Sequence, residues 1–582
     1  MSTHSVTAAV FMAQALKAEG VEKVFGQCGH TNYALIDACD RVGIEYVSFR
    51  HEQQAVHAAD AYYRVSRKLA VINVHLSPGL TNTITGIASA AMDGTPMLVI
   101  CGNTPSYHHP REAHQAMRLH ADASQGDMLR PICKRVWRVD IAEHLPDVMH
   151  RALNIAQTGR PGAVLLDIPM DIFAKKLSVD PETLNRRPNY PRSVGAPDGL
   201  AEAVKALRSS KRPVIFAGNG IALSGAYAEL QAVAETLQAP VATTLVGKGV
   251  FKETHPLSLG TTGIWGARVA NETVHNADVI LAVGTAFGEA DCSSWRQDQV
   301  FNIPGSKLIH IDIDPQEIGK SYPVDIGIVG DAAATLSALN DLLKAAPRDE
   351  TSIAEQRAAL QDGKARWREE LKETQEIDTK PIHPARLLKV LSQEAPDNAV
   401  FVTDVGWNKN GAGQQLEIRG RNGFITSGGM ATMGYSPAAA VGAKLGAPDR
   451  KVLGLVGDGG LMSVLGALTT AVELDIPVLW VLFNNFCYST IRTVGTTYFN
   501  NKNGTEFSTP DGELYNPDFQ LLAKSFGIAS ALIEEPADLE EGVRKAMAED
   551  RPFLLEVRTR GDVPMPRTGY WDIADFLASG ND

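Results

Sequence analysis

Apolar stretches of strand length alternate with longer helical patterns along the whole chain. Examples of the apolar stretches are residues 69–74, 97–100, 163–168 and 478–483. Continuous apolar runs of this length, separated by helices, are typical of parallel sheets that are covered by helices on both faces. The pattern predicts an α/β protein with three doubly wound parallel-sheet domains.

Two stretches interrupt this rhythm and are predicted to be linkers. Residues 186–192 combine arginines with prolines, and residues 347–381 form a polar helical region between two prolines. A chain of 582 residues has room for several domains of ordinary size. We therefore expect a first domain over residues 1–187, a central domain over 188–365, and a third domain over 366–582.

Composition narrows the class of protein. Hydrophobic residues make up 44% and charged residues 21%, as in ordinary globular proteins. The net charge is −12 and no basic run is present, which argues against a nucleic-acid partner. The longest apolar runs are far shorter than the ~20 residues that span a bilayer, and the N-terminus does not resemble a secretory signal. We expect a cytoplasmic protein without a membrane partner.

The six cysteines are scattered along the chain, with no C-x-x-C and no close grouping with histidine. Such spacing supports neither a disulfide framework nor a structural zinc site.

The most informative motif is Gly-Asp-Gly-Gly at residues 457–460. An apolar strand precedes it, a helical pattern over residues 462–473 and a second strand follow it, and then comes Asn484-Asn485. Glycines at the end of a strand let the backbone approach a diphosphate closely, and the next helix directs its N–H groups toward it. Asn485 follows Asp458 by 27 residues, at the end of the predicted neighbouring strand. Oxygen ligands beside a diphosphate suit Mg²⁺.

The G-D-G and N-N pair at this spacing resembles the fingerprint of thiamine-diphosphate (ThDP) enzymes. Over nearly its whole length the chain is similar to the acetolactate synthase and pyruvate oxidase group. The resemblance implies that Asp458, Asn485 and the Cys487 carbonyl bind the metal. It also implies that the first domain binds the aminopyrimidine ring, that the third binds the diphosphate, and that the glycines of the motif contact the cofactor: Gly457, Gly459 and Gly460.

The first third contains an independent match. Residues 50–55, Arg-His-Glu-Gln-Gln-Ala, resemble the family's R-H-E-Q-x-A and precede a helix pattern rich in alanine. Activation of ThDP requires a carboxylate that bonds to the pyrimidine ring and favours its imino tautomer, which removes the thiazolium proton. The resemblance assigns this role to Glu52.

A third segment, residues 427–435, resembles the family's S-G-G-x-G-T-M-G. In the family the methionine supports the bent cofactor and a nearby carbonyl receives the aminopyrimidine, so Met433 and Ala431 are candidate cofactor contacts. Ala431 replaces a residue that is usually glycine.

Two histidines distinguish the chain from acetolactate synthases. His30 lies in Phe-Gly-Gln-Cys-Gly-His, where those enzymes have F-G-x-P-G-G, and His75 lies where they have a small residue. Both positions are predicted strand ends that face the reacting carbon in relatives, so the histidines would place proton donors and acceptors in a pocket that is otherwise apolar. Gln125 matches a loop glutamine that reaches the same pocket.

The central third has a strand that ends in glycine before a helix, at residues 214–220. With other strand ends, it matches positions where relatives contact FAD, although Ala286 replaces a common arginine. FAD is the expected occupant, and ADP or an empty structural domain are the alternatives. The candidate contacts are Gly218, Thr244, Leu245, Gly284, Asp312 and Asp331.

The resemblance implies a ThDP- and Mg²⁺-dependent lyase or carboligase (transferase). Its donor would be a 2-oxo acid such as pyruvate, and its product a 2-hydroxy ketone or an acetolactate-like acid. The alternative is a 1,2-diketone hydrolase of the cyclohexane-1,2-dione type, which His30 and His75 would suit. A third possibility is a regulatory or nucleotide-binding protein without catalytic activity. The presence of Glu52, Asp458 and Asn485 together argues against it. In the family two subunits share each cofactor, so we expect a homodimer or homotetramer.

Overall fold

The computed structural model describes residues 4–109, 111, 113–117, 124–179, 191–345, 347–573 and 575. The described residues form two compact units. The first unit comprises Met1–Tyr190, Ser427–Gly454 and Met462–Val478, and the second comprises Pro191–Thr426, Leu455–Leu461 and Leu479–Asp582. Each unit is described by itself below. No helix in the described part of the chain has the length and apolar character needed to cross a membrane.

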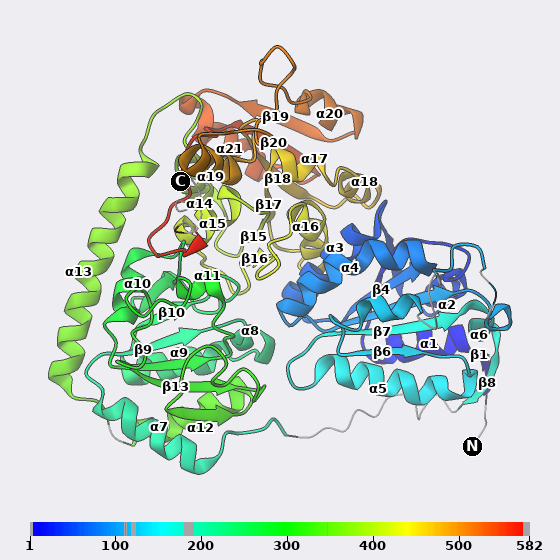
Figure 1. Cartoon of the computed structure of the whole chain (residues 1–582), viewed down its shortest axis with the longest axis horizontal. Coiled ribbons are helices and arrows are strands. Elements are labelled where there is room, and N and C mark those ends of the chain that lie inside the picture. The colour runs from blue at the N-terminus through cyan, green and yellow to red at the C-terminus, as the bar shows by residue number, and fades with distance from the viewer. Residues whose placement is uncertain are drawn as a thin grey trace. The chain divides into compact units, whose positions relative to one another are not determined.

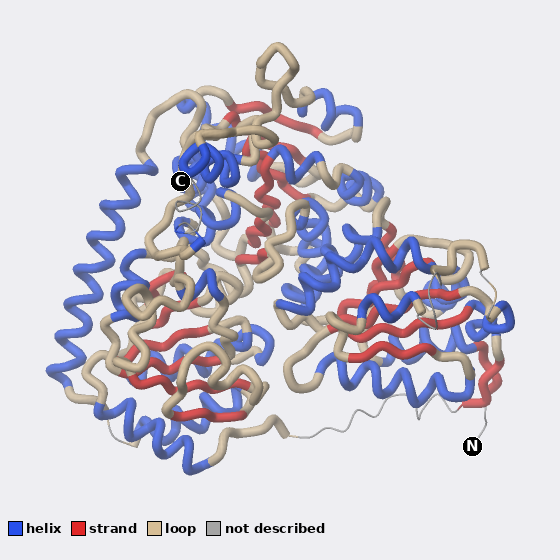
Figure 2. The backbone as a smooth tube through the Cα atoms, viewed as in Figure 1, coloured by secondary structure: helices blue, strands red, loops and turns tan. Residues whose placement is uncertain are grey.

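Strands of the described residues form three six-stranded parallel sheets and one antiparallel pair, drawn in red in Figure 2. The first sheet has the order β3 (Glu45–Ser48), β2 (Lys23–Gly26), β4 (Ala70–His75), β5 (Met97–Asn103), β7 (Ala163–Pro169) and β6 (Arg135–Arg138). The second has the order β11 (Ser258–Thr261), β10 (Val241–Thr243), β9 (Pro213–Ala217), β12 (Val279–Val283), β13 (Lys307–Asp312) and β14 (Ile326–Val329). The third has the order β16 (Phe424–Thr426), β15 (Val400–Thr403), β17 (Val452–Gly457), β18 (Val478–Asn484), β20 (Phe553–Arg558) and β19 (Ala529–Ile533). The antiparallel pair joins β1 (His4–Thr7) to β8 (Lys176–Val179).

Helices follow most strands and cover the sheets. In the N-terminal part they are α1 (Ala8–Ala18), α2 (Tyr33–Arg41), α3 (Glu52–Ser66), α4 (Leu76–Met92), α5 (Leu145–Gln157) and α6 (Met170–Ala174). In the central part they are α7 (Pro197–Ser209), α8 (Gly220–Ser224), α9 (Tyr227–Leu237), α10 (Arg268–His275), α11 (Glu289–Cys292) and α12 (Ala332–Lys344). The later ones are α13 (Glu350–Gln375), α14 (Pro384–Glu394), α15 (Trp407–Gln415), α16 (Tyr435–Gly446), α17 (Asp458–Met462), α18 (Gly466–Glu473), α19 (Ser489–Phe499), α20 (Phe519–Ser525) and α21 (Leu539–Ala548).

The first sheet shows why the apolar runs form a doubly wound layer. In Figure 1, α3 and α4 lie on one face of this sheet and α1 and α5 on the other. Residues of β5 and β7 are buried throughout, and alternate ones, such as Leu98 and Ile100, pack with α1 and α5. Side chains of a strand alternate between the two faces, so only continuously apolar strands suit a sheet with helices on both sides. The predicted fold class is confirmed.

The predicted linkers have different outcomes. Residues 186–190 of the first linker lie outside the described residues. Most of the second is α13, a long helix with few buried residues that packs with α10 and α14 within the second unit (Figure 1). The expected domain boundaries stay a prediction.

The predicted helix over residues 462–473 is wrong in its bounds. The structure has a short helix, α17, that begins at Asp458 itself, and a second helix, α18, that begins at Gly466. Glycine is required at position 459 of this first turn, because a Cβ there would lie 2.4 Å from the Tyr488 ring. The break falls at residues 463–465, where the Val464 carbonyl accepts a hydrogen bond from Gln54 Nε2 at 3.4 Å.

Candidate functional site

Glu52 lies where a helix begins at the carboxyl end of the first sheet. His51 is the N-cap of α3, and its ring accepts a hydrogen bond from the Gln53 N–H. Glu52 therefore lies in the first turn, where the helix dipole favours a negative charge. Its side chain is buried and accepts a hydrogen bond from Asn82 Nδ2 at 2.9 Å. The polypeptide therefore holds this carboxylate at a fixed place in the first turn of α3.

Two neighbours shape the space around this carboxylate. With its side-chain nitrogen toward Glu52, the Gln27 amide donates to Oε1 at 2.8 Å and to Oε2 at 3.2 Å. A Cβ at Gly79 would lie 3.2 Å from Oε1, so glycine leaves the carboxylate its room. Gln27 and Asn82 were not singled out in the sequence, since a lone amide carries no recognisable pattern.

The structure brings His30 and His75 together at the same edge of the first sheet. Their ring centroids lie 4.5 Å apart at an interplanar angle of 62°. His75 is the last residue of β4, and a Cβ at Gly29 would lie 2.2 Å from its ring, so the ring rests against this glycine. His75 Nδ1 lies 2.8 Å from Thr31 Oγ1. The two histidines predicted from the sequence thus form one pair.

The side-chain amide of Gln125 points into the interior of the first unit. The residue is 3% exposed. Its Nε2 donates to Asp167 Oδ1 at 2.8 Å, and its Oε1 accepts from Ser77 Oγ at 2.9 Å. Asp167 is fully buried, and this burial raises the pKa of its carboxyl while hydrogen bonds from Gln125 and Asn103 oppose the shift. The Gln125 amide therefore bridges the buried Asp167 carboxyl to the Ser77 hydroxyl.

The segment with Ala431 and Met433 also lies in the first unit. Ala431 adopts a left-handed backbone conformation with φ of 48°, which L-residues other than glycine reach at a cost of about 1–2 kcal/mol. This explains why glycine is the usual residue there. Ser427 supports the loop by accepting hydrogen bonds from the backbone N–H groups of Ala431 and Thr432. Met433 is 41% exposed, so its side chain is available for contact.

A buried ionic network links α3 to this loop. Tyr435 donates to Asp60 Oδ2 at 2.5 Å, and Arg64 forms ion pairs with Asp60 and Asp93. Asp93 Oδ1 accepts a hydrogen bond from the Gly429 N–H at 3.3 Å. The network holds the loop against the helix that begins at Glu52. The sequence does not predict this network, because its residues come from three separate segments of the chain.

In the second unit, Asp458 is buried among hydrogen-bond donors. Its Oδ2 accepts from the backbone N–H of Phe486 at 2.7 Å and from Asn516 Nδ2 at 2.9 Å, and its Oδ1 accepts from Gly459 N–H at 2.9 Å. Burial raises the pKa of the Asp458 carboxyl, and these hydrogen bonds oppose the shift. The loop after β18 is thereby fixed to the turn after β17.

Asn485 and Cys487 lie on that loop. The backbone N–H of Asn485 approaches Asp458 Oδ2 at 3.2 Å, so the two predicted metal ligands are neighbours. Phe486, between Asn485 and Cys487, has φ of 59°. Burial raises the pKa of the Cys487 thiol to about 12, so this residue would contribute its backbone carbonyl and not a thiolate. No cluster of three His, Cys, Asp or Glu side chains suited to a metal occurs among the described residues.

The start of α15 also lies beside Thr490 and Gly457, and the sequence did not predict this. Gly406 is its N-cap, with φ of 106°, a conformation that requires glycine. The hydroxyl of Thr490 is buried without a partner among the described residues, 3.9 Å from the position of a Cβ at Gly406. Asn408 Oδ1 lies 4.0 Å from the position of a Cβ at Gly457. The sequence alone did not show that Gly406 has a positive φ, so it gave no reason to single this glycine out.

In the central sheet, the predicted nucleotide contacts follow neighbouring strands. Gly218 and Gly284 pack so closely that a Cβ on Gly218 would lie 2.1 Å from the Gly284 carbonyl oxygen. Asp331 is the N-cap of α12, and Leu245 N–H donates to Asp291 at 2.8 Å. Thr244 Oγ1 accepts from Gly247 N–H and Asp312 accepts from Asp314 N–H. The strand ends form compact glycine turns, and several of their polar groups already form hydrogen bonds within the protein.

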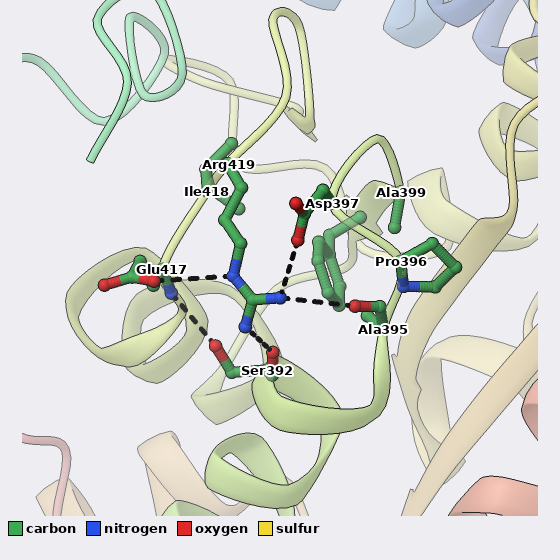
Figure 3. Close-up of a pocket in the computed structure, with 9 residues that line it drawn as sticks. Ser392, Ala395, Pro396, Asp397, Ala399, Glu417, Ile418 and Arg419 are labelled. Atoms are coloured by element: carbon green, nitrogen blue, oxygen red, sulfur yellow. Dashed lines mark hydrogen bonds and ion pairs between the residues drawn. The ribbon is translucent and has the colours of Figure 1, made fainter. Parts of the chain in front are cut away.

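A small surface pocket in the second unit has a structural explanation. Figure 3 shows the Arg419 guanidinium within it, donating to the carbonyls of Ser392 and Ala395 and pairing with Asp397 and Glu417. A cation at the last carbonyls of α14 satisfies groups that the helix leaves unpaired and complements its dipole. The residues that line the pocket are Ser392, Ala395, Pro396, Asp397, Ala399, Phe401, Glu417, Ile418 and Arg419.

Family models match the chain in three places. They describe a thiamine pyrophosphate enzyme N-terminal TPP-binding domain at residues 6–124, a central domain at residues 200–339, and a C-terminal TPP-binding domain at residues 404–557. The chain belongs to the ThDP enzymes of the acetolactate synthase group. It is 35% identical to a probable acetolactate synthase large subunit of Methanocaldococcus jannaschii, over 94% of this chain and 90% of the relative.

Bacterial relatives give the same picture. Identity is 32% with the acetolactate synthase isozyme 3 large subunit of Escherichia coli, over 94% of this chain and 93% of the relative. It is 34% with the acetolactate synthase large subunit of Lactococcus lactis, over 94% and 91%. The similarity to this ThDP enzyme group therefore spans all three sheets.

The residues present fit ThDP. The unpartnered Thr490 hydroxyl, the glycine at position 406 and the open space at Gly457 are features that suit a diphosphate. In the other unit, the buried Glu52 carboxylate has the acceptor oxygens that a pyrimidine ring nitrogen requires. Each set of residues suits the part of the cofactor that the family assigns to it.

Proposed function

We propose that the protein joins two 2-oxo acid molecules, with pyruvate or a close analogue as donor, to give an acetolactate-like acid. The observation that carries the proposal is the similarity to acetolactate synthase large subunits over 94% of the chain. In this reaction the donor loses its carboxyl group as CO₂, and its acyl carbon forms a new bond to the acceptor's carbonyl carbon. Release of CO₂ is the lyase step and carboligation is the transferase step of this one reaction.

ThDP, when bound, supplies a carbon nucleophile and an electron sink for this chemistry. Glu52 would accept a hydrogen bond from the pyrimidine ring of the cofactor, and Asn82 and Gln27 hold the carboxylate in place for it. Met433 and a backbone carbonyl near Ala431 would support the cofactor ring. The glycines 457, 459 and 460, with Gly406, leave the backbone accessible to the diphosphate.

Mg²⁺ is part of the proposal. Asp458, the Asn485 side chain and the Cys487 carbonyl would supply its protein ligands, and the diphosphate the rest. All are oxygen donors, which is the ligand set that Mg²⁺ prefers. The Asn485 backbone N–H bonds to Asp458, so the two turns that carry these side chains are already adjacent in the second unit.

The central domain is proposed to bind FAD. The support is the set of compact turns at Gly218 and Gly284, whose glycines permit a close backbone approach. ADP is the alternative, favoured by the replacement of the relatives' arginine with Ala286. The absorption spectrum of the purified protein tests this: a flavin band near that of free FAD supports the proposal, and release of ADP alone on denaturation would refute it.

His30 and His75 favour one second candidate, hydrolysis of a 1,2-diketone. Their rings form a pair, where an acetolactate synthase has apolar groups. Opening a cyclic diketone requires a proton donor and a water molecule beside the reacting carbon, and a histidine pair could supply the former. Carboligation is the first candidate, because the similarity to acetolactate synthase large subunits covers 94% of the chain.

The test is product analysis of the purified protein with ThDP and Mg²⁺. Pyruvate should yield an acetolactate-like acid and CO₂, and Glu52→Gln should yield neither. Conversion of cyclohexane-1,2-dione to a linear acid, with no product from any 2-oxo acid, would establish the hydrolase instead.

A further inference from the structure

We propose that Gln115 is a positioning residue of this site. Together with Thr31 it holds His75 as a neutral imidazole with its proton on Nε2, which leaves His30 as the histidine of the pair that exchanges protons with the substrate. This inference rests on the proposed function, because it assigns roles within the same site.

The directions of the hydrogen bonds fix the tautomer. The Thr31 backbone N–H can only donate, and it points to His75 Nδ1 at 3.4 Å, with the Thr31 hydroxyl at 2.8 Å. Nδ1 is therefore an acceptor and carries no proton. In a neutral ring the proton is then on Nε2, which lies 3.1 Å from Gln115 Oε1, an atom that only accepts. Both ring nitrogens of His75 are thus used within the protein.

His30 differs in this respect. Its side chain is exposed, and its ring contacts His75 edge to face without a hydrogen bond to any described residue. Gln27, three residues earlier, reaches Glu52, so the loop after β2 places His30 at the same sheet edge as the carboxylate that serves the cofactor. Of the two histidines, His30 has nitrogens free to meet a substrate.

The loop that carries Gln115 is tethered to the interior. The Met117 N–H donates to Ser77 Oγ at 2.9 Å, and Ser77 donates in turn to Gln125 Oε1 at 2.9 Å. Gln125 donates to the buried carboxylate of Asp167 at 2.8 Å. Every group in this chain of hydrogen bonds has one fixed direction, because a carboxylate accepts and a backbone N–H donates. The position of Gln115 is thereby linked to the core, and Gln125 acquires a role through it.

The charged and titratable groups around His75 are His30, His114 and Glu52. Burial lowers the pKa of His75; the bond to Gln115 and the charge of Glu52 oppose this, and the two other histidines add to it. His75 is accordingly neutral near pH 7, in agreement with the hydrogen-bond directions.

The first test reads the tautomer directly. The full-length protein, labelled with ¹⁵N-histidine and saturated with ThDP and Mg²⁺ without substrate, is examined by NMR, and His75 is assigned from the spectrum of His75→Asn. We expect a protonated, pyrrole-type Nε2 and an unprotonated Nδ1 at pH 7.5. The opposite tautomer, or an imidazolium ion, would overturn the inference. Because no substrate is present, this result is independent of whether pyruvate is the true donor.

The second test changes the acceptor. Gln115→Glu places a carboxylate beside Nε2, which stabilises the imidazolium form and raises the pKa of His75. The kcat/KM profile should then gain an acidic limb that falls roughly tenfold for each pH unit below that pKa. Gln115→Leu removes the acceptor for the Nε2 proton while the Thr31 N–H still holds Nδ1, so the tautomer should persist, the Nε2 resonance should move, and kcat/KM should fall several-fold. Since Gln115 is exposed, neither variant is expected to unfold.

Gln297→Leu, which alters an exposed glutamine of the central part, is the matched control and should retain the wild-type tautomer and pH profile. If Gln115→Glu keeps the wild-type pH profile and Gln115→Leu keeps the wild-type Nε2 resonance and kcat/KM, and only their melting temperatures fall, Gln115 is merely structural and the inference is wrong. A confirmed tautomer in a protein that does not convert pyruvate would instead contradict the proposed function alone.

Discussion

At the scale of single residues, the two carboxylates assigned to ThDP differ in their surroundings. Glu52 is buried with side-chain amides as its partners, whereas Asp458 is held mainly by backbone N–H groups of the loop after β18. Amide side chains can turn to serve a new partner, but backbone groups cannot. Glu52 is thereby suited to exchange hydrogen bonds with a cofactor, and Asp458 to organise the loop that carries Asn485.

Glu52→Gln should nearly abolish turnover while the protein keeps its fold and its ThDP affinity. An amide does not exchange the proton that the pyrimidine ring requires, and loss of a general acid or base typically lowers the rate by ~10²- to 10⁴-fold. Steady-state kinetics with calorimetry on the same samples checks this. Glu45→Gln, an exposed carboxylate on β3, is the control. Turnover of Glu52→Gln within twofold of the wild type would contradict the assignment.

The buried histidine His310 makes a pH-dependent contribution to stability. Burial lowers its pKa to about 4, and its Nε2 donates to the Thr285 carbonyl at 3.1 Å. The ring is neutral in the folded protein and becomes protonated in the unfolded chain below its ordinary pKa of about 6.5. The stabilisation is therefore present above pH 6.5 and is lost as the pH falls toward 4, by an amount on the order of 3 kcal/mol.

His310→Gln keeps a donor for the Thr285 carbonyl but does not titrate. Its free energy of unfolding, measured by denaturant titration at several pH values, should fall less than that of the wild type between pH 6.5 and 4. An equal fall in the two proteins would show that His310 does not contribute to the acid sensitivity.

At the scale of elements, the site depends on what happens just after each strand. β2 and β4 end at the histidine pair, and β17 and β18 end at Asp458 and Asn485. In a doubly wound sheet the carboxyl ends of the parallel strands form the ligand-binding edge. The chemistry is therefore located in short loops, while the strands and helices fix their positions.

Asp458→Ala should lose ThDP affinity in the presence of Mg²⁺, because the loop carrying Asn485 loses its anchor and the metal loses a ligand. Removing the carboxylate also leaves buried N–H groups unpaired, which costs roughly 1–3 kcal/mol of stability. Asp458→Asn keeps one acceptor oxygen in nearly the same shape, so it leaves fewer of those groups unpaired than Asp458→Ala while removing the charge. Isothermal calorimetry would measure both variants against Asp511→Ala, an exposed control. Unchanged ThDP affinity in Asp458→Asn would refute the role as a metal ligand.

At the scale of the whole molecule, the residues proposed to bind the two ends of the cofactor lie in different units, with Glu52 in the first and Asp458 in the second. The family shares each cofactor between subunits, so we expect an obligate dimer or tetramer with closed symmetry. Mixing inactive Glu52→Gln and Asp458→Ala chains, with subunit exchange, should restore one good site in each mixed dimer. Random pairing then gives roughly a quarter of wild-type activity. No recovery after proven exchange, or a fully active monomer, would contradict the shared site.

Much of this could be predicted from the sequence, because strand length, glycine turns and motif spacing are local properties. The three parallel sheets and the placement of Glu52, Asp458 and Asn485 at strand or helix ends follow from them. Features that depend on distant segments could not be predicted. The amide of Gln125 donates to the buried Asp167 of β7, and His75 is hydrogen-bonded by a loop residue 40 positions away. The break before α18 likewise lies beside a distant residue, Gln54 of α3, whose amide donates to the Val464 carbonyl.

The central claim is that this chain joins 2-oxo acids, and the most direct measurement is mass spectrometry of its products. The purified protein with ThDP and Mg²⁺ would be given ¹³C-labelled pyruvate, other 2-oxo acids and cyclohexane-1,2-dione in separate reactions. The account predicts a five-carbon 2-hydroxy-3-oxo acid from pyruvate, with one labelled CO₂ released per product, and no such product from Glu52→Gln. A protein that opens the cyclic dione but forms no carbon–carbon bond from any 2-oxo acid would contradict it.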